Sequence, residues 1–334
     1  MKLGLALPHY DFSLPGPGVV GWSRIRDWAQ RAEEMGFDSL WVSDHLFLDV
    51  SKYGGTSHRY FAMECFTTLA ALSAWTSRVR LGALVVCNDL RRPQLVAKMA
   101  ANLSAISNGR FELGLGAGWY EPEYKEARIP FRSAGKRINR LEEAIQLIRG
   151  MLGEPSFTFA GTHYHVNEAW TVPNPGGSDR PVPVWVGGKG NRVLALAGRH
   201  ADGFNASWAW TPEAFGDRVR LVEASAAQAG RDPKGIKKSV GLHCLPGRDE
   251  SEVEMRWERY LASVPYGVGA GLSLSTWRQD KLAGAPKDIA GRINDFRGKG
   301  AEEVILNFGL LPFQISDASA VQDFVREVRP LLRN

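Results

Sequence analysis

The sequence contains little cysteine and no long hydrophobic run. Its three cysteines, Cys65, Cys87 and Cys244, lie far apart and form no C-x-x-C motif, so they predict no disulfide framework and suit a reducing compartment. No apolar run approaches the ~20 residues of a membrane span. The apolar start at residues 3–7 is too short for the core of a signal peptide. We therefore expect a cytoplasmic protein without a membrane partner.

The chain also lacks a block of one charge sign. Its 41 basic and 36 acidic residues give a formal charge of +5, and they are dispersed along the sequence. A nucleic-acid-binding face would need clustered lysine and arginine, so we expect a small-molecule substrate and no nucleic-acid partner. The small positive excess supports only a weak preference for anionic ligands.

Motifs of several enzyme classes are missing. No Walker A sequence, Ser-His-Asp order or paired-carboxylate spacing stands out. His163 and His165 would share one side of a strand, but the sequence offers no third metal ligand within reach. We interpret them as exposed histidines of a hairpin and expect no metal.

What the sequence does contain is an alternation of strand and helix patterns. Eight apolar runs have the length and composition of buried strands: residues 3–7, 39–43, 79–86, 111–115, 182–186, 203–206, 239–245 and 303–307. Helical patterns alternate with them. This order predicts the α/β class and a (β/α)8 TIM barrel.

Two stretches interrupt the alternation. Residues 153–180, after the fourth helix, combine a hairpin pattern with prolines, and residues 264–285, before the eighth strand, are irregular. The chain exceeds the ~250 residues of a plain barrel by about what these insertions need. No internal repeat or linker stands out, so we expect residues 1–334 to form a single domain.

The fourth strand ends in a glycine-rich stretch. Gly114, Gly116 and Gly118 stand at every second position and are followed by Trp119 and Tyr120. Two interpretations remain open: a flat ring or an acidic group approaches the bare backbone, or the glycines only relieve crowding in a turn. The spacing does not fit the dinucleotide-binding fingerprint, which needs glycine where Trp119 stands.

Asp44 and His45 follow the second strand directly. In a barrel this places them at the C-terminal end, where active sites lie. A carboxylate beside a group that titrates near neutral pH can serve as a base or a hydrogen-bond relay. The alternative is an aspartate that caps the next loop beside a solvated histidine. Their position favours the functional interpretation.

The fifth strand runs into Gly187-Gly188-Lys189-Gly190-Asn191. Exposed backbone N–H groups before a helix form an anion site, and phosphate is the usual guest. The alternative is an ordinary βα turn, but the glycines exceed what such a turn needs. We expect a phosphate site here.

Other side chains at strand ends allow weaker inferences. Cys87 ends the third strand beside Asn88, and a small buried thiol is its expected role, with catalysis as the alternative. Several aromatic residues are candidates for a flat pocket, although each by itself is better explained by packing: Trp119, Tyr120, Trp170, Trp208 and Trp210.

With these stretches in place, the chain resembles the luciferase-like monooxygenase superfamily, and most of all its branch that uses the deazaflavin coenzyme F420. The matching stretches are residues 36–45, 81–93, 100–124, 183–191 and 201–205. The resemblance implies a barrel, a homodimer and F420 as cofactor, with FMN as the alternative. One departure is Trp119, which stands where sugar-phosphate dehydrogenases of the family carry a catalytic acid. It favours an apolar or aromatic substrate.

The resemblance also implies roles for single residues. Asp44 and His45 would face the reactive edge of the deazaflavin as catalytic residues. A non-proline cis peptide would fall on Leu84-Val85 and back the central ring. Gly187 and Gly188 would hold the phosphate. The expected cofactor-binding residues are Asp44, Leu84, Val85, Cys87, Asn88, Gly116, Gly118, Trp119, Gly187, Gly188, Lys189, Gly190 and Asn191.

We therefore expect an F420-dependent oxidoreductase that transfers a hydride between the deazaflavin C5 and a small organic substrate. The cofactor would supply the redox chemistry, and the protein would supply orientation and proton handling. Two alternatives stay open. One is a monooxygenase that uses reduced FMN, and the other is a flavin-binding protein without turnover.

Overall fold

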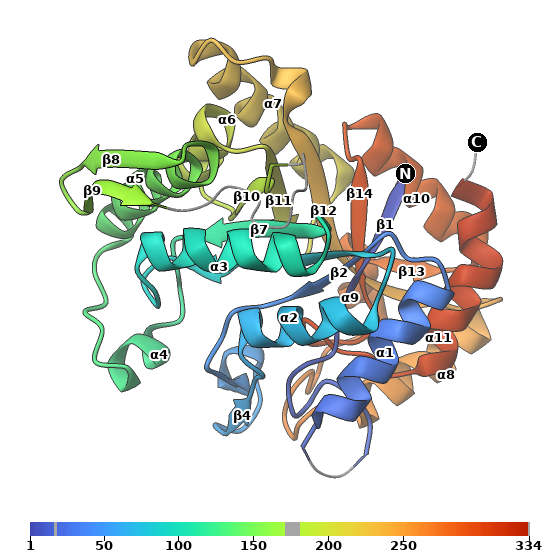
Figure 1. The fold of residues 1–334 in the computed structure, drawn as a ribbon. Helices are drawn as coiled ribbons and strands as arrows, with labels where there is room; N and C mark the ends of the chain where they lie inside the picture. The colour runs from blue at the N-terminus through green and yellow to red at the C-terminus, as the bar shows by residue number, and fades with distance from the viewer. Residues whose placement is uncertain (17–18, 171–180, 333–334) are drawn as a thin grey trace.

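Eight parallel strands form a closed barrel, with helices packed around it (Figure 1). The computed structural model describes residues 1–16, 19–170 and 181–332. The barrel strands are β1 (Lys2–Ala6), β2 (Ser39–Val42), β5 (Arg80–Ala83), β7 (Phe111–Gly116), β10 (Val184–Gly187), β11 (Gly203–Ser207), β12 (Lys237–Pro246) and β14 (Glu303–Asn307). β14 pairs with β1, and β7 pairs with β10, which closes the barrel. The predicted α/β class and TIM-barrel fold are confirmed.

Helices alternate with the barrel strands, as the sequence pattern predicts. They are α1 (Trp22–Glu34), α2 (Cys65–Trp75), α3 (Pro93–Ile106), α4 (Glu121–Glu126), α5 (Ala134–Gly153), α6 (Asn191–His200), α7 (Pro212–Gln228), α8 (Glu250–Ala262), α9 (Leu274–Trp277), α10 (Pro286–Gly298) and α11 (Ala318–Asp323). The caps explain several of the boundaries. Thr211 and Asp249 each accept a hydrogen bond from the first turn of the helix that follows, α7 or α8.

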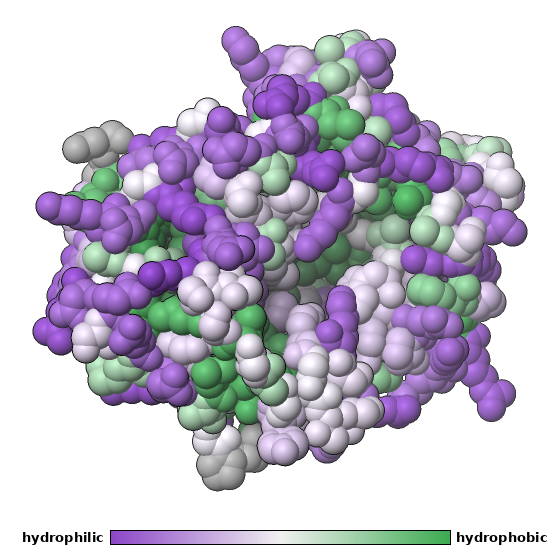
Figure 2. All heavy atoms as spheres, turned by 180° about the vertical axis from the view of Figure 1, so that it is seen from behind, coloured by the Kyte–Doolittle hydropathy of each residue, from purple (hydrophilic) through white to green (hydrophobic). Residues whose placement is uncertain are grey.

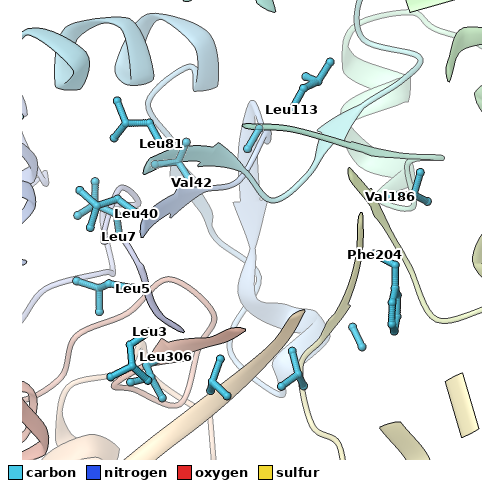
Figure 3. Packing of buried hydrophobic residues seen from close by; sticks show 14 of the residues in the cluster. Leu3, Leu5, Leu7, Leu40, Val42, Leu81, Leu113, Val186, Phe204 and Leu306 are labelled. Carbon is cyan, nitrogen blue, oxygen red and sulfur yellow. The ribbon is translucent and has the colours of Figure 1, made fainter. Parts of the chain in front are cut away.

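The main hydrophobic core lies between the barrel and its helices. Alternate strand residues such as Leu3, Leu5, Leu40 and Val42 pack in one cluster with Leu69 of α2 (Figure 3). These side chains are fully or almost fully buried. The alternation leaves the other face of each strand to fill the barrel interior.

Two tryptophans fill the inside of the barrel. The rings of Trp41 and Trp185 meet at 6.0 Å in a T-shaped contact. A side chain at Gly82 would overlap the Trp41 ring, and one at Gly203 would overlap the Trp185 ring. Glycine in the neighbouring strands therefore makes room for two large rings, which close the barrel beneath its C-terminal end.

The third strand is not continuous, as the sequence pattern over residues 79–86 had suggested. It splits into β5 and the short β6 (Val86–Cys87), and the peptide between Leu84 and Val85 is cis. The resemblance had placed a cis peptide at this position, and the structure contains it. A second non-proline cis peptide joins Ser207 to Trp208.

Both predicted insertions differ in detail from the expectation. The first contains the hairpin β8 (Ser156–Ala160) and β9 (His165–Trp170), while residues 171–180 lie outside the described residues. The second is more regular than predicted, because it holds α9 and β13 (Leu282–Gly284), which pairs in parallel with β12. The prediction of one domain is not tested by this arrangement and stays a prediction.

Other elements were not predicted or were predicted too simply. The loop after β2 contains a hairpin of β3 (Phe47–Asp49) and β4 (Arg59–Phe61), and α4 follows β7. The last helical stretch of the described chain is α11 followed by a π turn and a 3-10 turn. Within the described ranges, none of the helices is long and apolar enough to span a membrane.

Candidate active site

His45 lies near the C-terminal end of β2 and is held by Glu123 of α4. Its Nδ1 is 2.9 Å from Glu123 Oε2, and Glu123 Oε1 accepts hydrogen bonds from the backbone N–H groups of Leu46 and Phe47. The Glu123 carboxylate is buried, with 2% of the residue exposed. A carboxylate on Nδ1 assigns the proton to that nitrogen and leaves Nε2 as the acceptor. Within the described residues, Nε2 has no hydrogen-bond partner.

Asp44 lies beside His45 but faces another partner. Both of its oxygens bind Arg91, at 2.7 and 2.9 Å, and one also accepts the Cys87 N–H at 3.0 Å. Asp44 is 3% exposed. Both of its oxygens accept hydrogen bonds from protein groups, so we assign it to fixing the end of the third strand rather than to proton transfer. The sequence reasoning missed Arg91.

A buried network supports the site from below. His9 donates from Nδ1 to the Leu7 carbonyl at 2.8 Å, and its Nε2 is 2.9 Å from the Ser43 hydroxyl. Ser43 also hydrogen-bonds the hydroxyl of Tyr10. Burial lowers the pKa of His9 to about 4, which keeps the ring neutral at pH 7. This network holds Tyr10 in place, and the Tyr10 ring lies 6.5 Å from that of His45.

The glycines of β7 make room for the side chain of Val85. A Cβ at Gly116 would lie 2.5 Å from Val85 Cγ2, and one at Gly187 would lie 2.7 Å from Cγ1. Gly114 would collide with the Ala83 carbonyl. The bare face expected from the sequence is therefore already covered, and a flat ring would rest against the half-buried Val85 rather than on the β7 backbone.

Gly118 and Trp119 follow β7 at the C-terminal end of the barrel, which we call the barrel mouth. Gly118 has φ +73°, and a side chain there would overlap the Tyr124 hydroxyl and approach Cys87 Sγ. Trp119 is 44% exposed, and its ring meets that of His45 at 5.5 Å. Lys52 lies over the other side, with Nζ 3.3 Å from the ring centroid. Trp119 thus lies beside His45, and its predicted role as a cofactor contact stays a prediction.

Cys87 and Asn88 face protein rather than an open space. Cys87 Sγ is 3.3 Å from the Tyr124 hydroxyl, and burial raises the pKa of the thiol to about 11, which suits the expected structural role. The Asn88 side chain donates to the Tyr164 hydroxyl at 3.1 Å and anchors the β8–β9 hairpin. We therefore do not include these two side chains among the cofactor contacts of the proposed site.

The glycine-rich loop runs into the first turn of α6. Gly190 is the N-cap, and no side chain caps this helix. A Cβ at Gly190 would meet nothing within 4 Å, whereas one at Gly188 would lie 2.7 Å from Val193 Cγ1. Uncapped N–H groups beside open space are what an anion needs. Asn191 accepts from Arg218 at 3.0 Å, which adds positive charge nearby.

Lysines flank this region. Lys189 donates to the Trp208 carbonyl at 3.3 Å. Burial lowers its pKa, and the charge of Lys281 lowers it further. The pKa of Lys52 is lowered by burial and then by the charge of Lys189. These ammonium groups are close enough to repel one another, so an anion between them would be stabilised.

The remaining aromatic and histidine candidates differ in burial and in their distance from the barrel end. Trp208 is partly buried at the mouth, and Trp210 is buried beneath Lys189. Trp170 is 73% exposed on the hairpin, so it does not join the pocket. His165 lies on β9 and His163 in the turn before it, and no group of metal ligands occurs among the described residues.

The surface is hollowed on the face shown in Figure 2, and apolar atoms lie inside the hollow. A separate groove of about 780 Å³ is lined by the loops near Phe12, Tyr60, Arg259 and Asp317, and by none of the predicted site residues. Phe12 stacks on Tyr10 at 4.9 Å, so these two rings stand between the groove and His45. The chemistry of the side chains makes the region around His45 the candidate active site.

Known proteins are similar to this chain in sequence. The chain is 31% identical to an F420-dependent glucose-6-phosphate dehydrogenase of Amycolatopsis mediterranei over 228 residues, which is 68% of this chain and 66% of that relative. It is 30% identical to the pyrimidine monooxygenase RutA of Escherichia coli (strain K12) over 241 residues, 70% of this chain and 60% of that one. The chain therefore spans about two thirds or less of the length of these relatives.

Solved structures share the fold. An F420-dependent secondary alcohol dehydrogenase in complex with an F420-acetone adduct superimposes with a TM-score of 0.77, at 21% identity, over 100% of this chain and 99% of that one. EDTA monooxygenase from Chelativorans sp. BNC1 gives 0.78 at 17% identity, over 100% and 93%. The family model for luciferase-like monooxygenases matches residues 1–307. With the closed barrel and the site at its C-terminal end, this match shows that the chain belongs to the luciferase-like monooxygenase family.

Proposed function

We propose that the protein is an F420-dependent oxidoreductase that acts on a small organic substrate. The observation that carries this proposal is His45, held by the buried Glu123 with Nε2 left free. Two further features fit the cofactor. The uncapped start of α6 beside the open Gly190 suits a phosphate, and Val85 offers a flat apolar contact for a ring. When bound, the deazaflavin would accept or donate a hydride at C5.

His45 would handle the proton that accompanies hydride transfer. Its Nε2 accepts a proton from a substrate hydroxyl, or returns one to a carbonyl oxygen in the reverse direction. The imidazolium that forms is stabilised by Glu123, which already binds Nδ1. General base catalysis of this kind contributes about 10²–10⁴-fold in rate. Asp44 serves by positioning, since Arg91 and the Cys87 N–H hold both of its oxygens.

The substrate proposal rests on Trp119. An indole stands where sugar-phosphate dehydrogenases of the family place an acid, and Glu123 points at His45 instead of replacing that acid. The rings of Trp119, Tyr10 and Trp208 favour an apolar or aromatic substrate. Lys52, which lies over the Trp119 ring, and Lys189, which follows Gly188 in the glycine-rich loop, would supply positive charge to anionic parts of the cofactor.

A direct titration separates this function from its rival, a monooxygenase that uses reduced FMN. This rival is supported by the sequence similarity to RutA and by the fold that the chain shares with EDTA monooxygenase. We expect oxidised F420 to quench the intrinsic tryptophan fluorescence at a lower concentration than FMN. Tighter binding of FMN, together with oxygen consumption by the reduced complex, would reassign the protein to the monooxygenases.

Compartment and assembly are part of the same proposal. The three cysteines are free and buried, which supports a reducing cytoplasm. A homodimer is proposed from the family resemblance. Sedimentation at micromolar concentration would test it, and a mass of about 36.8 kDa at every concentration would contradict it.

A further inference from the structure

His243 lies on the inner face of β12, near its C-terminal end. Its neighbours Leu242 and Cys244 point outward into the main core, and Gly241 faces the Trp208 ring, where a Cβ would lie 2.9 Å from it. The register pairs His243 with Asn307, the last residue of β14. This places the imidazole at the level of the barrel mouth, on a strand far from the one that precedes His45.

The hydrogen bonds of His243 fix which nitrogen carries the proton. Nδ1 lies 2.6 Å from the Gly309 carbonyl and 2.9 Å from Asn307 Nδ2. Asn307 Nδ2 also donates to the carbonyls of Gly309 and Leu311. Because the Gly309 carbonyl can only accept, the proton is assigned to Nδ1, and Nε2 keeps its lone pair.

That lone pair is available. His243 is 5% exposed, and Nε2 has no hydrogen-bond partner among the described residues. The ring packs against Trp208 at 5.6 Å and Trp277 at 6.2 Å. A buried acceptor with an apolar surround is a site for a hydrogen-bond donor.

A continuous series of rings joins His243 to His45. Trp208 meets Phe313 at 5.6 Å, Phe313 meets Tyr10 at 6.3 Å, and Tyr10 meets His45 at 6.5 Å. Tyr10, Phe313 and Trp208 also belong to the hydrophobic cluster that contains Val85. The two histidines therefore stand at opposite ends of one aromatic wall, which we define as Tyr10, Phe313 and Trp208.

The two histidines differ in the group that binds Nδ1, and we therefore expect different roles for them. His45 has a carboxylate, which stabilises a positive ring, whereas His243 has the single backbone carbonyl of Gly309, which does not carry a full charge. Burial, with smaller contributions from Lys281 and Lys189, lowers the pKa of His243 to about 4, although the hydrogen bond to Gly309 and the charge of Asp280 oppose this shift. His243 therefore stays neutral and can hold a donor without taking its proton.

We propose that His243 is a positioning residue that accepts, through Nε2, a hydrogen bond from a donor group on the substrate that is remote from the reacting carbon. The proposal rests on the oxidoreductase function above and names its substrate class. The substrate is a small aromatic alcohol with a second hydroxyl at its far end. The ring would lie along the aromatic wall, with the reacting group at His45 and the second hydroxyl at His243.

Matched ligands test this. The full chain, loaded with oxidised F420, is titrated with 1-(4-hydroxyphenyl)ethanol, 1-phenylethanol and 1-(4-methoxyphenyl)ethanol. We expect the phenol to bind about tenfold more tightly than the other two, because the methoxy compound fills the space but cannot donate. His243→Phe should abolish the preference, His243→Gln should restore part of it, and His45→Asn should keep it.

Nitrogen NMR of histidine-labelled wild-type protein gives a second readout that does not need a variant. The Nε2 signal of His243 should move upfield when the phenol is added and stay in place with 1-phenylethanol. Equal affinities in the wild type, a preference that survives in His243→Phe, or an unmoved Nε2 signal would each overturn the proposal. Cofactor loading is measured first from the absorbance of bound F420, so loss of the oxidoreductase function is recognised separately. If FMN binds instead, the same ligands are titrated into the FMN-loaded chain.

Discussion

Glu123 Oε2 lies 2.9 Å from Nδ1 of His45, although 78 positions separate the two residues in sequence. The carboxylate comes from a six-residue helix after β7, and the histidine comes from the loop after β2. Glu123 Oε1 also accepts hydrogen bonds from the backbone N–H groups of Leu46 and Phe47, which fixes the loop that carries His45. One buried side chain thus sets both the position and the tautomer of the proposed base.

Glu123→Gln should slow hydride transfer by at least ~10²-fold and leave F420 affinity nearly unchanged. The amide would donate to Nδ1, which moves the ring proton to Nε2 and removes the acceptor. Stopped-flow absorbance at saturating F420 measures the rate. Glu121→Gln is the matched control, because Glu121 lies in the same helix and pairs only with the exposed Lys125. Equal rates in both variants would remove the pair from the chemistry.

Arg91→Met should destabilise the protein by about 3–5 kcal/mol, because it leaves the Asp44 carboxylate buried without its counter-ion. Urea unfolding followed by circular dichroism measures the loss. Adding Asp44→Asn should recover much of it, since the buried charge is then gone. The exposed pair of Arg59 and Glu126 provides the control, and Arg59→Met should change stability by less than about 1 kcal/mol. A small effect of Arg91→Met would show that water screens Asp44.

Gly190→Asp should have opposite effects on stability and on cofactor binding. An aspartate at the N-cap satisfies first-turn N–H groups and adds a few tenths of a kcal/mol. The same carboxylate would repel a phosphate, and we expect F420 to bind at least ~10-fold more weakly. Gly190→Ala adds a methyl group into open space without charge and serves as the control. If affinity is the same in all three proteins, α6 does not bind the phosphate.

Gly116→Ala should destabilise the barrel by about 1–3 kcal/mol, since the new methyl group would lie 2.5 Å from Val85 Cγ2. Val85→Ala removes that methyl and should relieve the clash in the double variant. A thermodynamic cycle from urea unfolding should give a coupling of at least about 1 kcal/mol. Gly153→Ala, at the end of α5 where nothing lies within 4 Å, is the control. Additive effects would mean that Val85 does not occupy this space.

Stability should fall as the pH drops from about 6.5 towards 4. The pKa values of His9 and His243 are lowered by burial from 6.5 to about 4, so only the unfolded chain takes up protons in this window. Each histidine then costs about 1.4 kcal/mol of stability per pH unit. Urea midpoints at pH 7 and 5 measure this. His243→Phe should reduce the slope, and an unchanged slope would place the titration elsewhere.

Strand and helix order was predictable because it depends on local patterns. Runs such as residues 182–186 are apolar over the length of a buried strand, and helical patterns alternate with these runs. The break after Ala83 followed from the family resemblance and not from the apolar pattern, which continues through Val86. Short elements such as α4 were missed because they carry too few residues to show a period.

The site was predicted only in part, for a physical reason. Position at a strand end selected His45, Asp44 and the loop at Gly187 as candidates, because barrel topology brings all strand ends together. The partners of these residues could not be predicted. Arg91 reaches Asp44 from 47 positions away, and such a pairing depends on how loops fold over the barrel.

The sequence by itself determined the closed barrel, the end of it that carries the site, and the glycines near the mouth, because each depends on residue type and local spacing. Only the tertiary structure decided what those glycines accommodate, which is Val85, and which nitrogens of His45 and His243 stay free. Those outcomes depend on contacts between side chains from distant strands and loops. Such contacts are set by packing in three dimensions and leave no periodic signal along the chain.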